Sequence, residues 1–164
     1  MRLVECVVET DDVDGFVDRL DVIGDRHGAT VQAFDGRYVV DRTHLERAVE
    51  CADRARERGE AIARERGVEV LLYAAGRRQI DRALAIGVDA GRTPAVVLVD
   101  GGDEAAAADA VRALDAVTPA ETLGAYDPER VREFFDVSDA ELAAADGDLA
   151  ALVHERVALL AVER

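Results

Sequence analysis

The sequence predicts an α/β fold in a single domain, residues 1–164, with a small mixed or antiparallel sheet packed with several helices. Short apolar runs suited to strands occur at residues 2–9 and 93–99, and the longer segments around them repeat apolar residues every three or four positions, as amphipathic helices do. A chain of 164 residues can bury a sufficient core without disulfides or a metal ion.

The first quarter of the chain reads as strand, helix, strand. Residues 2–9 carry apolar side chains on both faces, which is typical of a central strand. Residues 13–20 follow helical spacing, and we expect this helix to end before Gly24. Residues 29–34 then form a second predicted strand.

A hairpin is predicted directly after this second strand. Asp35 and Gly36 tolerate the positive φ angles of a tight turn. Residues 37–40 would then return as the second arm.

The middle of the chain predicts consecutive helices. Thr43, with Glu46 three residues later, has the spacing of a capping box, and Gly59 is placed to end that helix. The next apolar run, residues 68–73, suits a buried strand by propensity. Its alanine-rich ends and Gly76 favour a helix instead.

A short helix is predicted after Gly76, ending at Gly87, with two arginines and an amide, Arg77, Arg78 and Gln79, near its start. The residues expected to face inward are Ile80, Ala83 and Leu84. Free backbone amides and guanidinium groups at a helix start attract anions, so this segment is a candidate anion site. The alternative is that the arginines only solvate the helix start or pair with nearby carboxylates.

The strand at residues 93–99 is followed by a glycine-containing turn, 100–103, and a predicted alanine-rich helix, 105–117. This order resembles a nucleotide site, but it has neither the spacing of a dinucleotide fingerprint nor the lysine of a P-loop. Asp100 and Asp103 would also stand where a phosphate should bind. We therefore interpret the segment as an ordinary turn.

Three helix starts are marked in the last third of the chain. Asp127 and Pro128 are a cap followed by a proline at the first helical position, and Ser138 with Glu141 forms a capping box. The final helix begins near Asp148. Its predicted core face consists of Leu149, Leu152, Val153, Val157 and Leu160.

The final helix has a second apolar face. At 100° per residue, Ala158, Leu159 and Val162 lie off the core stripe. This face either docks a partner or is tucked into the protein's own core.

The composition is strongly acidic, with a formal net charge of -15, no lysine and only 4% aromatic residues. Dense carboxylates keep a surface hydrated in concentrated salt, where their repulsion is screened, so we read the acidity as a sign of a high-salt cytoplasm. Neighbouring carboxylates therefore say little about catalysis. The charge also does not exclude nucleic acid, since binding in molar salt depends on stacking, shape and hydrogen bonds.

No catalytic constellation is recognisable. The only serine, Ser138, is at a helix cap, and the three histidines are not at metal-ligand spacing. Cys6 and Cys51 are far apart and are expected to be small buried residues. We expect no metal, no cofactor and no enzymatic activity. No segment has the form of a signal peptide or a membrane span, so we expect a soluble, cytoplasmic protein.

Residues 43–87 resemble the kinase-binding small subunit of the archaeal and eukaryotic KEOPS complex, here with a composition of haloarchaeal type. The motifs that carry the resemblance are His44-Leu45, Ala63-Arg64 with Glu69, and Leu-Leu-Tyr-Ala-Ala-Gly-Arg-Arg-Gln-Ile at residues 71–80. Residues 16–38 and 121–147 match only loosely.

The resemblance implies a non-catalytic subunit, a monomer outside the complex, that binds and stimulates an atypical kinase or ATPase subunit. It also implies recruitment of tRNA through the 3′ CCA end, for threonylcarbamoyl-adenosine modification beside the anticodon, and a helical 68–73 segment. The expected tRNA-binding residues are His44, Arg64, Arg77, Arg78 and Gln79. The expected kinase-subunit interface consists of Val157, Leu159, Leu160 and Val162. The competing hypothesis is a small α/β enzyme or sensor that binds an anionic metabolite at Arg77 and Arg78.

Overall fold

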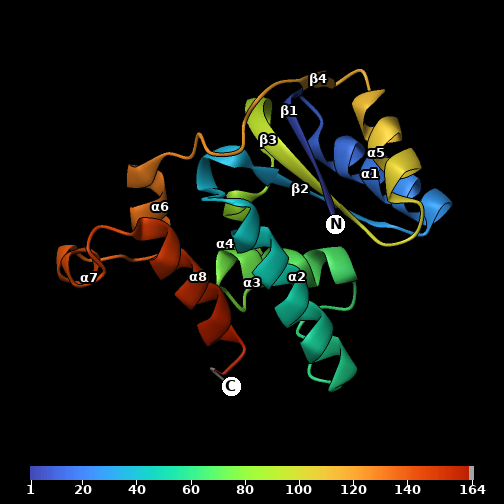
Figure 1. Ribbon diagram of the computed structural model, residues 1–164. Coiled ribbons are helices and arrows are strands. Elements are labelled where there is room, and N and C mark those ends of the chain that lie inside the picture. Colours follow the sequence, from blue (N-terminus) through green and yellow to red (C-terminus); the bar gives the residue numbers. More distant parts are fainter. Residues whose placement is uncertain (163–164) are drawn as a thin grey trace.

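The computed structural model describes residues 1–162 and is built on a four-stranded antiparallel sheet with strand order β2-β3-β1-β4 (Figure 1). The strands are β1 (Arg2–Thr10), β2 (Thr30–Asp35), β3 (Gly91–Asp100) and β4 (Val117–Pro119). The strand β1 pairs with β3 along its whole length and with β4 on its other side. The predicted α/β class and the central position of the first strand are confirmed, and the sheet is antiparallel.

Helices cover both faces of the sheet (Figure 1). The helices α1 (Val13–His27) and α5 (Glu104–Arg112) pack on the face that carries Val97 and Val99. The helices α2 (Arg42–Glu57) and α3 (Arg66–Ala75) pack on the opposite face, where Val96 and Leu98 point. The C-terminal helix α8 (Leu149–Leu160) packs against α2 and α3. The alternation along β3 therefore separates the two core clusters that lie on opposite faces of the sheet.

The remaining elements are short. They are η1 (Gly36–Tyr38), α4 (Ile80–Ala83), η2 (Leu84–Ile86), α6 (Pro128–Phe134) and α7 (Asp139–Ala144). The caps predicted at Asp127 and Ser138 are confirmed, and Ser138 forms its capping box with Glu141. The predicted core face of the last helix is buried throughout. The 68–73 segment is helical, as part of α3.

The helix α1 continues past the glycine where we expected it to end. It runs to His27, and Gly28, at φ 66°, ends it by donating its N–H to the Gly24 carbonyl. A Cβ atom on Gly24 would lie only 2.6 Å from the Ala29 carbonyl oxygen. Because Gly24 has no side chain, the backbone of Ala29 can pass close to the helix just after its end. The prediction that Gly24 ends the helix was wrong.

The predicted hairpin at Asp35 and Gly36 was also wrong. The strand β2 pairs with β3, and the chain leaves the sheet after Asp35 in the 3₁₀ turn η1. The Asp35 carboxylate accepts the Arg37 backbone N–H at 3.0 Å and forms an ion pair with the Arg37 guanidinium at 2.8 Å. This local cap holds residues 36–38 in a turn, so they are not available as a strand.

The helix α2 begins two residues earlier than the predicted cap at Thr43 allows. Asp41 is the N-cap, and its carboxylate accepts the His44 backbone N–H at 2.8 Å. Thr43 lies inside the first turn, and Glu46 pairs with Arg42 at 2.7 Å. The expected capping box is therefore replaced by a single aspartate cap, a favourable choice for the positive end of a helix.

The helix α5 ends at Arg112, five residues before the predicted end at Val117. Val117 instead begins β4, where it lies opposite Val8 of β1. Three residues of strand carry too little alternation to be found in a sequence, and the pairing with β1 creates them.

Candidate functional site

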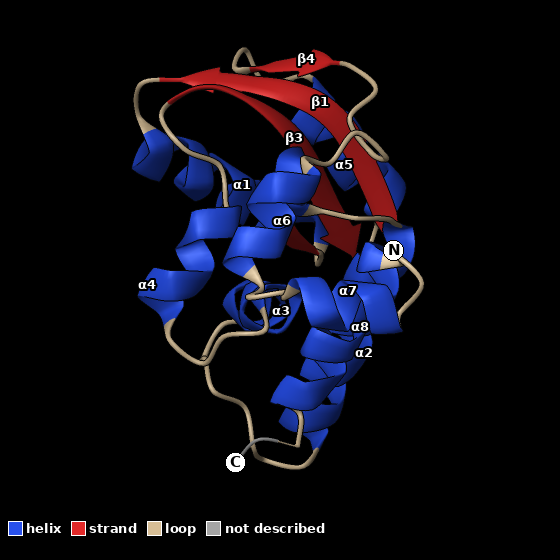
Figure 2. Ribbon diagram, turned by 90° about the vertical axis from the view of Figure 1, so that its left-hand side faces the viewer, coloured by secondary structure: helices blue, strands red, loops and turns tan. Residues whose placement is uncertain are grey.

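The helix α3 positions the most recognisable part of the sequence. Its residues 69–75 are all buried, and Gly76 ends it in the left-handed conformation, at φ 62°. A Cβ atom on Gly76 would lie 3.3 Å from the Arg156 carbonyl oxygen of α8. Gly76 therefore brings the end of α3 against α8 and turns the chain toward Arg77 and Arg78. The helix α3 lies between α4 and α8 (Figure 2).

Arg77 is engaged with α6. Its Nη2 donates to the Phe134 carbonyl, its guanidinium lies 5.0 Å from the centre of the Phe134 ring, and Asp136 is 3.7 Å away. A cation over an aromatic face adds attraction to the hydrogen bond. Arg77 therefore holds the C-terminal end of α6 while part of its side chain remains accessible.

Arg78 and Gln79 are exposed, as predicted, but two of the three apolar residues that were expected to face inward do not. Ile80 is 47% exposed and Leu84 58%, whereas Ala83 is fully buried. The helix α4 is a single turn and continues as a 3₁₀ turn, so a 3.6-residue spacing does not select one face here. We name the surface formed by Arg78, Gln79 and Ile80 the α4 corner.

His44 is fully buried, away from the surface where we expected it to contact RNA. Its Nδ1 accepts the Val40 backbone N–H at 3.3 Å, and its Nε2 lies 2.8 Å from the Ala74 carbonyl oxygen. This pattern fits a neutral ring protonated at Nε2. Burial lowers the pKa of His44 to about 4. His44 therefore joins α2 to α3 inside the core, which corrects its predicted role.

Arg64 is exposed but stands apart from the α4 corner. It precedes α3, whereas Arg78 follows it, and a ten-residue helix separates the two by about 15 Å. The loop that carries Arg64 is held by the buried carboxylate of Glu69, which accepts backbone N–H groups from Ile62 and Ala63, each at 2.9 Å. The structure therefore does not gather the five predicted tRNA-binding residues into one site.

The four predicted interface residues of α8 divide into two pairs. Val157 and Leu160 are buried against α2 and α3 and are not available to a partner in this conformation. Leu159 is 36% exposed and Val162 is 73% exposed. We name the surface of Leu159 and Val162 the α8 face. With Ala158, which is also exposed, this pair forms the second apolar face that the sequence predicts.

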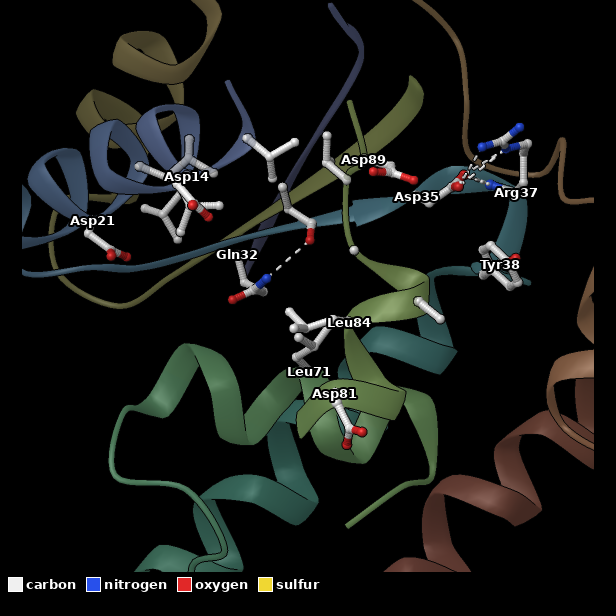
Figure 3. Close-up of a pocket in the computed structure, with 18 of the residues that line it drawn as sticks. Asp14, Asp21, Gln32, Asp35, Arg37, Tyr38, Leu71, Asp81, Leu84 and Asp89 are labelled. Atoms are coloured by element: carbon white, nitrogen blue, oxygen red, sulfur yellow. Dashed lines mark hydrogen bonds and ion pairs between the residues drawn. The ribbon is translucent and has the colours of Figure 1, made fainter. Parts of the chain in front are cut away.

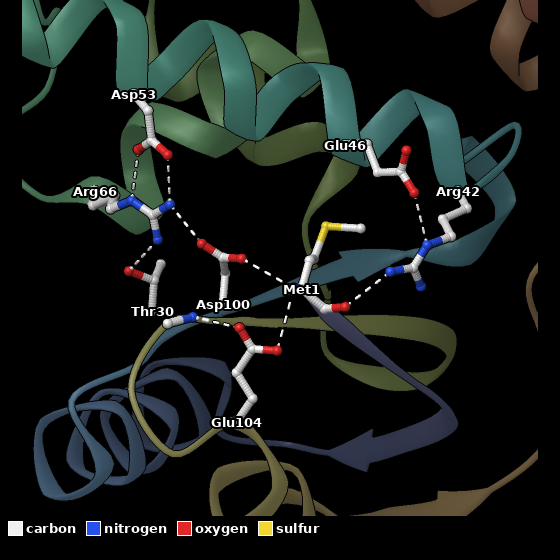
Figure 4. Close-up of polar contacts among 9 residues, drawn as sticks. Met1, Thr30, Arg42, Glu46, Asp53, Arg66, Asp100 and Glu104 are labelled. Atoms are coloured by element: carbon white, nitrogen blue, oxygen red, sulfur yellow. Dashed lines mark hydrogen bonds and ion pairs between the residues drawn. The ribbon is translucent and has the colours of Figure 1, made fainter.

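Arg66 forms a polar junction that sequence reasoning missed (Figure 4). It pairs with Asp53 of α2 at 2.8 Å and Asp100 of β3 at 2.6 Å, and it donates to Thr30 of β2 at 3.0 Å. The hydrogen bond to Asp53 is the main reason that the pKa of Arg66 is raised. Burial alone would raise the pKa of Asp100, but its bond to Arg66 lowers it. Nothing local in the sequence connects these partners.

A cleft of about 610 Å³ runs along β2, between α1 on one side and α4 with η2 on the other (Figure 3). Its lining includes apolar residues from both sides, Val17 and Leu84, and residues of β2 between them. Its carboxylates are Asp14, Asp21, Asp35, Asp81 and Asp89. Segments far apart in the sequence form this cleft, so no sequence motif marks it.

Cys6 is buried as predicted, and burial raises its pKa to about 11, whereas Cys51 is half-buried. Within residues 1–162, no three His, Cys, Asp or Glu side chains are grouped as metal ligands. In the same range, no helix has the length and apolar character needed to cross a membrane.

Comparison with known families identifies the chain. Residues 19–161 match the profile of the family described as kinase binding protein CGI-121, which covers most of the sequence. A comparison with curated proteins found no match. The matched region includes α2, α3, the α4 corner and α8. The chain therefore belongs to the CGI-121 kinase-binding protein family, the family of the kinase-binding subunit of KEOPS.

Proposed function

We propose that this chain binds and stimulates the atypical kinase subunit of KEOPS and recruits tRNA through its 3′ CCA end. The observation that carries the RNA part is the composition of the α4 corner. Arg78 offers a cation for phosphate, Gln79 an amide for base edges, and Ile80 an exposed apolar surface for a base face. These are the contacts that single-stranded RNA requires. Arg77 is a partial contributor, since it also holds Phe134.

The α8 face is our proposed contact for the kinase subunit. Burial of an apolar side chain of this size contributes about 1.5–3 kcal/mol, so two of them matter at an interface. The buried Val157 and Leu160 support this face from below, because they anchor α8 to α2 and α3.

The competing hypothesis of a small anionic metabolite receives less support from the geometry. The helix α4 is a single turn, so few backbone dipoles align at its start. Arg77 is also partly committed to α6. An extended ligand that contacts Arg78, Gln79 and Ile80 in succession fits this surface better than a small anion does.

The RNA site is tested by Arg78→Glu. We expect this variant to weaken tRNA binding by about tenfold or more, because it replaces a charge-assisted phosphate contact with repulsion. Binding to the kinase subunit should not change. The measurement is fluorescence anisotropy with intact tRNA and with tRNA that lacks its CCA end.

The matched control is Arg26→Glu, which makes the same charge change at an exposed position of α1, in the other helical layer. An equal loss of tRNA affinity in both variants would mean that only net charge matters. Unchanged tRNA binding by Arg78→Glu would refute the α4 corner as the RNA site.

The kinase contact is tested by Leu159→Glu. A carboxylate in an apolar interface is desolvated without a partner, so we expect loss of copurification with the kinase subunit. Val22→Glu is the control, since Val22 is similarly exposed but lies on α1. Copurification of Leu159→Glu at the wild-type level would rule out the α8 face.

A further inference from the structure

The outer edge of β2 is open. This strand is the last in the sheet and pairs only with β3. The carbonyl of Ala33 accepts the side-chain amide of Gln32 at 3.1 Å, so it points away from β3. Alternate residues of a strand direct their backbone groups to the same side, so the N–H and C=O groups of Val31, Ala33 and Asp35 face outward. Such a row of groups is a template for another strand.

The cleft of about 610 Å³ lies along this open edge, between the two helical layers (Figure 3). Val17 of α1 and Leu84 of η2 present apolar side chains from its two walls, and both are exposed. A further strand would lie about 4.8 Å from β2 and would direct alternate side chains to the two walls. The cleft therefore has backbone groups at its floor and apolar surface on both sides.

The cleft carries an excess of negative charge. Its two arginines are paired, Arg37 with Asp35 and Arg130 with Asp127. Asp14, Asp21, Asp81 and Asp89 line the same cleft, and none of them forms a salt bridge with residues 1–162.

The surroundings of Asp21 agree with an excess of negative charge in the cleft. Its pKa is raised, first by burial and then by repulsion from Glu65, Asp18 and Asp25. The negative potential is therefore not neutralised within the cleft, and positive side chains on a ligand would be attracted. The phosphates of a nucleic acid would be repelled by the same carboxylates.

We propose that this cleft binds an extended segment of a partner protein that carries arginine or lysine side chains and adds to the sheet as a strand beside β2. The backbone of the segment pairs with Val31 and Ala33. Its apolar side chains pack between Val17 and Leu84, and its basic side chains contact the carboxylates. Main-chain pairing supplies affinity, and the walls supply the sequence preference.

The probe is a fluorescent seven-residue peptide that alternates arginine and valine. Binding is measured in 1 M KCl, where charge interactions are screened beyond about 3 Å. We expect the peptide to bind and to slow hydrogen exchange of the Val31 and Ala33 amides. A second peptide has the same side chains but alternate N-methylated amides, which cannot donate to the strand. We expect it to bind at least about tenfold more weakly.

Charge reversal on α1 tests the location. Asp14→Arg with Asp21→Arg changes two carboxylates of the cleft and should abolish peptide binding. The control, Asp18→Arg with Asp25→Arg, changes two exposed carboxylates of the same helix outside the cleft and should bind normally. The far-UV circular dichroism of both variants is compared with that of the wild type, and the single change Asp81→Arg on α4 repeats the test if the first pair unfolds.

Equal loss of binding in the two pairs of variants, or equal binding of the N-methylated peptide, would overturn the proposal. Protection of the Val31 and Ala33 amides by a CCA-ended RNA, and not by the peptide, would overturn it as well. The Arg78→Glu variant should bind the peptide normally. The experiments therefore distinguish a wrong peptide site in the cleft from a wrong RNA site at the α4 corner.

Discussion

At the scale of single residues, His44 links folding to pH. Its ring is buried between Val40 and Ala74, and burial lowers its pKa from 6.5 to about 4. Between these values the unfolded chain binds the proton more readily than the folded protein does. The stability associated with a neutral His44 is therefore complete above pH 6.5 and is lost as the pH falls toward 4. By pH 4.5 the loss is of the order of 2.5 kcal/mol.

The variant His44→Gln tests this linkage. The amide can still accept from Val40 and donate to Ala74, but it does not titrate in this range. We expect the variant to be less stable than the wild type at pH 7.5, and the difference to narrow by about 2 kcal/mol at pH 4.5. Urea unfolding at both pH values measures it. A stability difference that stays constant would show that His44 does not titrate as proposed.

His44 and Arg77 show what cannot be predicted from the sequence about single residues. His44 and Arg77 were both selected as candidate RNA ligands, because they stand at helix starts in recognisable motifs. The partner of His44 is 30 residues away, and the partner of Arg77 is 57 residues away. Side-chain direction depends on such distant partners. Exposure of Arg78 and Gln79 was predicted correctly because their neighbours in the sequence include a glycine and polar groups.

At the scale of elements, the junction of α3 with α8 can be tested with two glycines. Gly76 and Gly59 both have positive φ angles, 62° and 69°. A Cβ atom on Gly59 would meet nothing within 4 Å, whereas one on Gly76 would lie 3.3 Å from the Arg156 carbonyl oxygen. Alanine at either position has the same backbone cost, and only Gly76→Ala also disturbs a helix contact.

We expect Gly59→Ala to lower the free energy of unfolding by about 1 kcal/mol, the cost of a left-handed alanine. Gly76→Ala should lower it by about 2 kcal/mol or more, because α8 must also shift. Urea unfolding of the two variants provides the comparison. Equal losses would mean that α3 and α8 are not closely packed at this point.

Elements with long local patterns were predicted well, and elements created by distant pairing were not. The strands β1 and β3 and the helix α8 each have enough residues for their period to be read from the sequence. The strand β4 has three residues and exists because β1 pairs with it. The turn η1 replaced a predicted hairpin because the Asp35 carboxylate caps it. A side chain that hydrogen-bonds the backbone in this way competes with strand pairing, and hydrophobic periodicity does not reveal it.

At the scale of the whole molecule, the sequence predicts a single α/β unit but not its strand order. The order β2-β3-β1-β4 leaves β2 at an edge, and the cleft follows from that placement together with the positions of α1 and α4. The candidate sites, too, were predicted only in part. Motifs and resemblance indicated α3 and α8, while the arrangement in space separated Arg64 from the α4 corner and buried half of the predicted kinase contact.

The contact between Gly76 and the Arg156 backbone has a consequence for the proposed function. It places the end of α3 directly against α8, and the α4 corner begins only two residues after that contact. A kinase subunit seated on one side of this joint and an RNA end held on the other would be kept at a constant mutual angle. The protein would then fix the distance and orientation between the kinase subunit and the tRNA end.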